Sequence, residues 1–195
     1  MELVRQTRSA VLMVVVLTVL VGIIYPLVMT GLAPLIFPYQ ANGSLMRDAK
    51  GNVIGSESIG QQFSDARYFH PRPSVAGDEG YDATASGGTN LGPTNKKLID
   101  SVQERAVAYR QENGLAPDAQ VPVDAVTASA SGLDPEISPA NAQLQVKRVA
   151  AARSLPEDQV RALVDKYTRG RTLGILGDPG NVLLAGNACQ FLCHI

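Results

Sequence analysis

Two histidines, His70 and His194, are the side chains in this sequence best suited to move a proton near neutral pH. His70 lies in the string YFHPRPS, and the acidic residues Asp78 and Asp82 follow it in the next stretch of the chain. A histidine with a carboxylate partner is a common general base in hydrolases. One hypothesis is therefore a hydrolase that uses His70 with Asp78 or Asp82. The alternative is that His70 only makes hydrogen bonds in a turn that the neighbouring prolines stiffen.

A glycine-rich segment, SGGTNLGPTN at residues 86–95, is the second candidate for chemistry. Its small residues expose backbone N–H groups, and a helix expected to begin near Asn95 would add a positively polarised N-terminus. A phosphate or carboxylate group could dock there. The alternative is a tight loop whose glycines let the backbone of another protein approach closely. The candidate residues are Ser86, Gly87, Gly88, Thr89, Asn90, Leu91, Gly92, Pro93, Thr94 and Asn95.

Other catalytic and metal-binding motifs are missing from the sequence. It has neither the G-x-x-x-x-G-K-[ST] loop of nucleotide-binding proteins nor the G-x-S-x-G elbow of hydrolases. The acidic cluster of Asp78, Glu79 and Asp82 offers fewer oxygens than calcium usually takes. Cys189 and Cys193 are spaced C-x-x-x-C, which differs from the C-x-x-C of redox and zinc sites. We therefore predict no metal site and, outside the His70 hypothesis, no catalytic residue.

An apolar segment near the N-terminus is the first structural element that the sequence predicts. No charged residue occurs between Arg8 and Arg47, and residues 10–25 read AVLMVVVLTVLVGIIY. About 20 apolar residues cross a hydrocarbon core of about 30 Å, so we predict a transmembrane helix over residues 9–33. The alternatives are a cleaved signal peptide and a buried core helix, but the segment has neither a small-x-small cleavage site nor a polar face. Pro26 is expected to kink or end this helix.

The charges around this segment predict its direction. Arg5 and Arg8 flank its N-terminal end, whereas the next cation is Arg47. By the positive-inside rule, we expect residues 1–8 in the cytoplasm and the body of the chain, residues 40–195, outside the cell membrane. A net charge of -1, from 17 basic and 18 acidic residues, and the absence of Trp argue against a nucleic-acid partner. The expected surroundings are membrane lipid and an extracytoplasmic space.

The body mixes helix and strand patterns. Amphipathic spacing, an N-cap at Ser138 and a capping box starting at Ser154 predict helices over residues 95–113, 138–153 and 154–170. Their expected buried stripes include Leu98, Ile99, Val102, Ala106 and Val107 in the first helix and Val160, Leu163, Val164 and Tyr167 in the third. Short apolar runs bounded by glycine predict strands over residues 52–59, 121–128, 172–176 and 181–184. We therefore predict an α+β fold, with one transmembrane helix followed by a single mixed α/β domain.

A long segment, residues 64–95, fits neither pattern because it is rich in Gly, Pro, Ser, Thr and Asn. Loops above about 12–15 residues in a compact domain are usually functional or disordered. Tyr68, Phe69, Tyr81 and Leu91 are spaced through it as if attached to a surface, so we predict an ordered loop that binds a partner. Disorder is the alternative. The expected partner contacts in YFHPRP are Tyr68, Phe69, His70, Pro71, Arg72 and Pro73.

Several strings, taken together, resemble the C subunit of the Kdp potassium-transporting ATPase. The strings are GSLM, IGQQF, YFHPRPS, ASGGTNLGPTN, VPVDAVTASASGLDP, ISPANAQLQVKRVA and GRTLGILGDPGNVL, in the family's order. With the apolar N-terminal segment, the resemblance covers nearly the whole chain. The sequence departs from the family at Glu136, where His is common, and in the tail over residues 185–195. Nothing is carried over to the cysteines of that tail.

The resemblance implies a noncatalytic accessory subunit of a complex that imports K⁺ at the expense of ATP. The implied partners are a potassium-channel-like subunit and an ATP-hydrolysing subunit. The family is described as stabilising the complex and as a catalytic chaperone that raises the affinity of the ATPase subunit for ATP. No firmly bound cofactor is implied, because ATP binds through the complex. The SGGTN string at residues 86–90 partly resembles the signature sequence of ABC transporters, which leaves direct nucleotide binding as a hypothesis.

The expected topology conflicts with direct nucleotide binding. If residues 40–195 lie outside the membrane, residues 86–95 cannot touch a cytoplasmic nucleotide. Any effect on ATP affinity would then be an indirect coupling between conformational states. The expected role of the long loop is to hold the assembly together near the ion entrance.

Overall fold

The structure is a computed structural model that describes the chain except for residues 1, 49, 172, 178–180 and 184–195. The chain divides into two compact units, Met1–Leu45 and Met46–Ile195, and each is described by itself. Cys189, Cys193 and His194 lie outside the described residues, as does the last residue of the strand predicted over residues 181–184. The predicted α+β class is confirmed, since a long apolar helix is followed by a mixed domain of helices and short strands.

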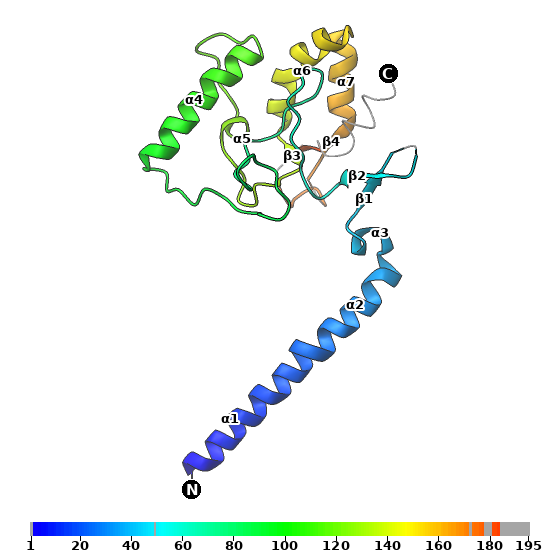
Figure 1. Cartoon of the computed structure of the whole chain (residues 1–195), viewed down its shortest axis with the longest axis vertical. Helices are drawn as coiled ribbons and strands as arrows, with labels where there is room; N and C mark the ends of the chain where they lie inside the picture. The colour runs from blue at the N-terminus through cyan, green and yellow to red at the C-terminus, as the bar shows by residue number, and fades with distance from the viewer. Residues whose placement is uncertain (1, 49, 172, 178–180, 184–195) are drawn as a thin grey trace. The chain divides into compact units, whose positions relative to one another are not determined.

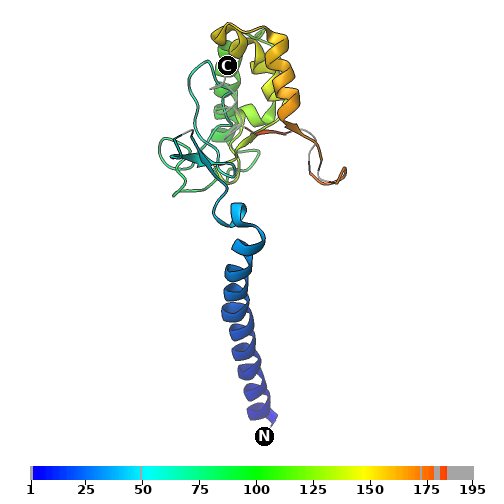
Figure 2. The same cartoon turned by 90° about the vertical axis from the view of Figure 1, so that its right-hand side faces the viewer.

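The first unit is dominated by one helical rod (Figures 1 and 2), which comprises α1 (Glu2–Val19), a π-helical turn η1 (Leu20–Ile24) and α2 (Tyr25–Ile36). A short helix, α3 (Pro38–Ala41), follows. Glu2–Ile36 is long and apolar enough to cross a membrane, with a mean hydropathy of 2.9 and no burial over its most apolar part. At about 1.5 Å per residue, this helix exceeds the thickness of a hydrocarbon core.

Pro26 does not end the helix, so that part of the prediction is wrong. A proline has no N–H group, and its ring collides with the carbonyl four residues earlier in a regular α-helix. Here the wider π-helical turn η1 ends at Ile24, two residues before Pro26, which occupies the first turn of α2. We infer that the wider turn accommodates the proline ring and lets the helix continue.

The second unit contains the remaining elements. Its helices are α4 (Lys96–Glu112), α5 (Val123–Val126), α6 (Pro139–Arg153) and α7 (Glu157–Tyr167). Its strands are β2 (Val53–Ser56), β3 (Glu136–Ile137), β4 (Thr168–Arg169) and β5 (Asn181–Leu183), while β1 (Leu45–Arg47) begins at the unit boundary and pairs with β2. The other sheet has the order β3-β5-β4, with both neighbours antiparallel to β5. In Figure 1, α6 and α7 pack together and α4 packs on α5.

Helix ends follow the predicted signals in two of three cases. Asn95 caps α4 by accepting a hydrogen bond from the Lys97 N–H, and Ser138 caps α6 by accepting one from the Asn141 N–H. The predicted capping box at Ser154 is wrong, because Ser154 adopts a left-handed conformation that ends α6. Such a conformation is typical of a helix C-terminus.

The core of the second unit lies between α6, α7 and β3. Its buried members are Phe69, Ile137, Ala142, Val146, Val149, Ala150, Val160 and Val164. The stripe predicted for the last helix is therefore confirmed at Val160 and Val164. On α4 the prediction fails for Ile99 and Val107, which are about half exposed, at 51% and 48%.

Among the described residues, two of the predicted strands are absent, those over residues 121–128 and 172–176, apart from a single bridge at Leu176. In the region 121–128 the chain makes the short helix α5, in which Ala125 and Val126 are buried and Val123 is exposed. Strand preference of valine depends on a partner strand, and no strand pairs with this stretch in the part of the chain that the structure describes. Residues 173–175 form a turn in which the Gly174 N–H bonds to the Arg171 carbonyl. The strands predicted near residues 52–59 and 181–184 are confirmed in shorter form as β2 and β5.

Candidate functional site

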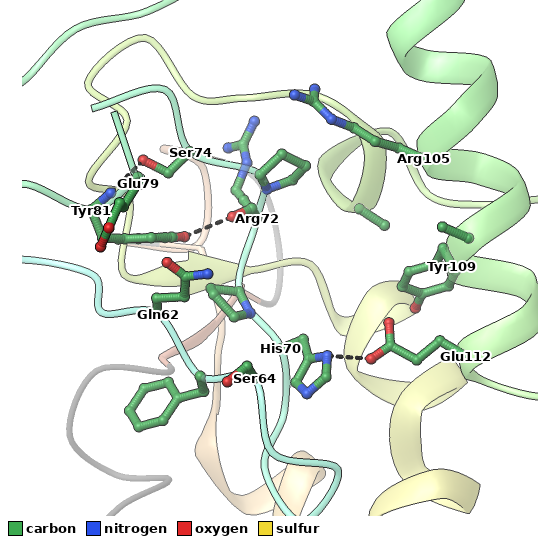
Figure 3. Close-up of a pocket in the computed structure, with 16 residues that line it drawn as sticks. Gln62, Ser64, His70, Arg72, Ser74, Glu79, Tyr81, Arg105, Tyr109 and Glu112 are labelled. Atoms are coloured by element: carbon green, nitrogen blue, oxygen red, sulfur yellow. Dashed lines mark hydrogen bonds and ion pairs between the residues drawn. The ribbon is translucent and has the colours of Figure 1, made fainter. Parts of the chain in front are cut away.

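A cavity of about 400 Å³ opens between the N-terminal half of the long loop and α4 (Figure 3). The loop contributes the whole run from His70 to Ser74, together with Tyr81. Helix α4 contributes Arg105, Tyr109 and Glu112. Four of the predicted partner-contact residues, His70 to Pro73, therefore line one cavity. The cavity is the candidate functional site of the described residues.

Buried Gln145 on α6 holds the loop at His70. Its side-chain oxygen accepts a hydrogen bond from the His70 N–H at 2.7 Å, and its side-chain nitrogen donates to the His70 carbonyl at 3.2 Å. Gln145 is fully buried, and its amide also bonds Asn141 and Arg148. One side chain therefore bonds both the N–H and the carbonyl of His70 and so fixes the position of the loop at this residue.

Two arginines of α6 extend this attachment. Arg148 donates from one terminal nitrogen to the carbonyls of Ala66 and Tyr68, at 2.7 and 3.0 Å. Arg153 donates to the Arg67 carbonyl at 2.7 Å, and its guanidinium lies over the Tyr68 ring. Burial lowers the pKa of Arg148, while the nearby carboxylate of Glu112 acts in the opposite direction. Helix α6 therefore determines the path of the loop from residue 66 to residue 70.

The imidazole of His70 bridges this loop to α4. Its Nδ1 lies 2.6 Å from the Glu112 carboxylate, and its Nε2 lies 3.1 Å from the Asp65 carbonyl and 3.4 Å from Arg148. The expected pairing of His70 with Asp78 or Asp82 is wrong. Helix α4 brings Glu112 to the ring, whereas the Asp82 carboxylate caps Thr84 within its own turn. Among the described residues, no hydroxyl group bonds to the imidazole.

Of the acidic residues that follow His70 in the sequence, Asp82 has a local structural role. Hydrogen bonds from Thr84 lower the pKa of Asp82, which is exposed, as are Asp78 and Glu79. In the part of the chain that the structure describes, no group of three or more His, Cys, Asp or Glu side chains is placed to hold a metal ion. The acidic cluster seen in the sequence is therefore not gathered around one point.

Arg72 and Tyr81 form the wall of the cavity away from α4. One terminal nitrogen of Arg72 donates to Asp134 at 2.6 Å, and the Tyr81 hydroxyl donates to the Arg72 carbonyl at 2.8 Å. The Ser74 hydroxyl donates to the Gly132 carbonyl and accepts the Tyr81 N–H. Burial raises the pKa of Tyr81 further above neutral pH, and its phenol is a hydrogen-bond donor. These bonds give the loop a defined path, as predicted for an ordered segment.

The glycine-rich segment 86–95 contacts the chain itself. The Gly87 N–H and the Ser86 hydroxyl both donate to the Ser131 carbonyl, at 2.9 Å each. A Cβ atom at Gly88 would lie 3.0 Å from the Ala130 carbonyl oxygen, and one at Gly132 only 2.8 Å from the Gly87 carbonyl oxygen. The close backbone approach expected of these glycines is therefore made to residues 130–132 of the same chain.

The end of this segment offers little to an anion. The Asn95 side chain already accepts the Lys97 N–H at the start of α4. Thr89, Asn90, Gly92, Pro93 and Thr94 are exposed, and Leu91 is half-buried. The structure thus separates the segment into a packed beginning and an exposed end, and the exposed end remains available to a partner.

A buried polar network around Asn141 holds Tyr109, which lines the cavity, and the sequence analysis missed it. The Asn141 side chain accepts a hydrogen bond from the Tyr109 hydroxyl at 2.9 Å and donates to Asp124 at 2.9 Å. Asp124 also accepts both the N–H and the hydroxyl of Ser138 at 2.8 Å. Burial raises the pKa of Tyr109. The available signal was the polar pair Asn141 and Gln145, four residues apart on a helix whose neighbouring positions are apolar.

Comparison with known proteins gives a consistent result. Residues 7–188 match the family model described as KdpC, K⁺-transporting ATPase, c chain. The chain is similar to the potassium-transporting ATPase KdpC subunit of Mycobacterium tuberculosis (strain ATCC 25618 / H37Rv), with 58% identity over 174 residues, 89% of this chain and 91% of the relative. It is also similar to the proteins of the same name from Koribacter versatilis (strain Ellin345), with 53% identity over 88% of this chain and 86% of the relative, and Caulobacter vibrioides (strain NA1000 / CB15N), with 52% identity over 92% and 89%.

Proposed function

Because the chain belongs to the KdpC family of K⁺-transporting ATPase c chains, we propose that it is a noncatalytic accessory subunit of an ATP-driven potassium import complex. Its partners are a potassium-channel-like subunit and an ATP-hydrolysing subunit, and its role is to stabilise their assembly. The observation that carries this proposal is the family match over residues 7–188, which covers most of both units of the structure.

The proposed location is a bacterial cell membrane, with residues 1–8 in the cytoplasm and the second unit outside. The apolar helix Glu2–Ile36, none of whose most apolar part is buried, supports a membrane anchor, since an apolar surface of this length is stable only in lipid or against a partner helix. The position of Arg5 and Arg8 before the apolar run supports the direction.

In this arrangement the subunit raises the ATP affinity of its partner indirectly, as a catalytic chaperone that favours one conformational state of the complex. The Asn95 cap and the Gly87 hydrogen bond support the indirect route, because they occupy the Lys97 and Gly87 N–H groups that a nucleotide phosphate would need. The occupied ring nitrogens of His70 likewise favour an accessory role over the alternative of a His70-dependent hydrolase.

Two charged substitutions test the assembly role. Thr89→Glu and Thr94→Glu together change only exposed positions of the segment 86–95, so the fold should persist while partner binding is lost. We expect co-purification of the other subunits and potassium-stimulated ATP hydrolysis to fall at least about tenfold, because a buried unpaired charge at an interface is costly. Lys147→Glu, on the exposed side of α6, is the matched control. Normal assembly of the double variant would remove this segment from the interface.

Protease accessibility on sealed vesicles tests the location. The second unit should be cut only from the extracytoplasmic side. Cleavage from the cytoplasmic side alone would instead support the hypothesis that residues 86–95 bind a nucleotide directly. A His70→Ala variant completes the set, since an accessory subunit should still assemble, whereas a hydrolase would lose a measurable activity of the purified chain.

A further inference from the structure

Two guanidinium groups lie in the wall of the cavity, and neither has its donors fully used. Arg105 donates one hydrogen bond, from a terminal nitrogen to the Val126 carbonyl at 3.1 Å, and no carboxylate among the described residues forms an ion pair with it. Arg72 is paired with Asp134, yet its Nε is buried with no acceptor in the part of the chain that the structure describes. A buried donor without an acceptor is rare in folded proteins. Because this Nε has no accessible surface, a ligand in the cavity could bond Arg72 only through its second terminal nitrogen, which makes no hydrogen bond among the described residues, and Arg105 through its unused N–H groups.

The negative charges around the cavity do not fill this role. Glu112 is engaged by His70 at 2.6 Å, and Asp134 already receives the terminal nitrogen of Arg72. Glu79 is exposed and lies on the opposite side of the cavity from Arg105 (Figure 3). One side of the cavity therefore carries unsatisfied cationic donors, and the other side carries a free carboxylate.

The wall between these charges is largely apolar. It includes the rings of Pro71, Pro73, Tyr81 and Tyr109 and the methyl groups of Ala108 and Ala125. A volume of about 400 Å³ suits a single amino-acid side chain or a small organic acid better than a nucleotide. A metal cation is disfavoured because Arg72, Arg105 and His70 all face the same space.

We propose that this cavity binds a carboxylate group, with Arg105 and Arg72 as the donors to its oxygens. A planar guanidinium matches the two oxygens of a carboxylate and can donate two parallel hydrogen bonds to them. The group has two possible sources, a free amino acid or an acidic side chain of a partner subunit. The partner's side chain as the source rests on the proposed function, whereas a free amino acid does not.

The free source is tested by titration of the full chain in detergent micelles with sodium glutamate, against sodium chloride at equal ionic strength. Binding should shift the side-chain N–H resonances of Arg72 and Arg105 in a saturable way. Arg105→Gln should weaken that binding about tenfold or more, because a charge-assisted hydrogen bond is lost. Arg110→Gln is the matched control, because Arg110 also lies on α4 and also bonds one backbone carbonyl, that of Ala119, but does not line the cavity.

The partner source is tested by co-purification of the complex. Arg105→Gln should reduce recovery of the other subunits several-fold relative to Arg110→Gln, while circular dichroism of the two chains remains the same. Arg105→Lys should restore part of the recovery, because it keeps the charge and loses the planar fork.

Each outcome is decisive. Saturable glutamate binding that depends on Arg105 supports the free source. No glutamate binding, with assembly that depends on Arg105, supports the partner's side chain. The carboxylate site would be overturned if the chain does not bind glutamate and if Arg105→Gln and Arg110→Gln assemble equally well with the other subunits. If the wild-type chain itself fails to assemble with other subunits, the proposed function fails, and the carboxylate site is then decided by the titration alone.

Discussion

Residues 68–73 and residues 86–95 belong to the same long loop, but different forces hold them in place. Side chains of α6 hold the first segment, chiefly Gln145 and Arg148, through directed hydrogen bonds to its backbone. Backbone contacts hold the second, where Gly87 and Gly88 lie against residues 130–132 and the remainder is exposed. The first segment can therefore form a fixed cavity wall, whereas the end of the second is free to adapt to a partner.

The strongest test of this contrast removes the attachment of the first segment. Gln145→Ala deletes a buried amide and leaves the His70 N–H, the His70 carbonyl and Asn141 short of partners. We expect a loss of about 3–4 kcal/mol in the free energy of unfolding, from unsatisfied groups and a new cavity. Urea unfolding followed by tyrosine fluorescence measures it.

The control for this variant is Gln143→Ala on the same helix. Gln143 bonds Asp165 and Arg161 at exposed positions, so its loss should cost under about 1 kcal/mol. Equal effects of the two substitutions would show that Gln145 does not hold the loop.

The second test loosens the packed beginning of the other segment. Gly132 has φ of +68°, and a Cβ there would lie 2.8 Å from the Gly87 carbonyl oxygen and 2.9 Å from the Ala76 Cβ. Gly132→Ala should cost about 2 kcal/mol through strain and collision. Hydrogen exchange at the Gly87 amide should speed up, while the His70 amide stays protected.

Gly92→Ala provides the comparison for that result. Nothing lies within 4 Å of a Cβ at Gly92, so the change should stay within about 0.5 kcal/mol of wild type. Faster exchange at both Gly87 and His70 in Gly132→Ala would mean that the two segments are held as one unit and not by separate contacts.

The smallest effect concerns the exposed residues Asp65 and Arg67, which precede the first segment. Hydrogen bonds from the Arg67 side chain lower the pKa of Asp65 from its ordinary value of 3.8 to about 2. Because the folded pKa is depressed, the resulting stabilisation is present above pH 3.8 and is lost as the pH falls through 2. Arg67→Gln should raise the pKa of Asp65 toward 3.8 in an NMR titration of its carboxyl carbon.

Asp82 serves as the internal reference in the same titration. Its pKa is lowered by Thr84 and not by Arg67, so it should not move in Arg67→Gln. An unchanged pKa at Asp65 would show that its low value arises from the backbone of the turn and not from the Arg67 side chain.

Local signals in the sequence were sufficient for several elements. The helix starts at Asn95 and Ser138 were predicted correctly because a cap acts within one helical turn. The prediction at Ser154 was wrong for a local reason: the spacing of Ser154 suits a capping box, but its backbone ends the preceding helix. Short strands were the least predictable, since β3 and β4 contain two residues each and exist only through pairing with β5.

The sequence alone determined the long apolar helix, the mixed nature of the body and the family strings, because composition and short-range order are written in consecutive residues. The tertiary structure decided the site. The Gln145 side chain bonds the backbone of His70, which is 75 residues away in the chain. The imidazole of His70 pairs with Glu112, although Asp78 and Asp82 are nearer in the sequence. Such contacts depend on how α4 and α6 pack around the loop, and no spacing along the chain encodes that packing.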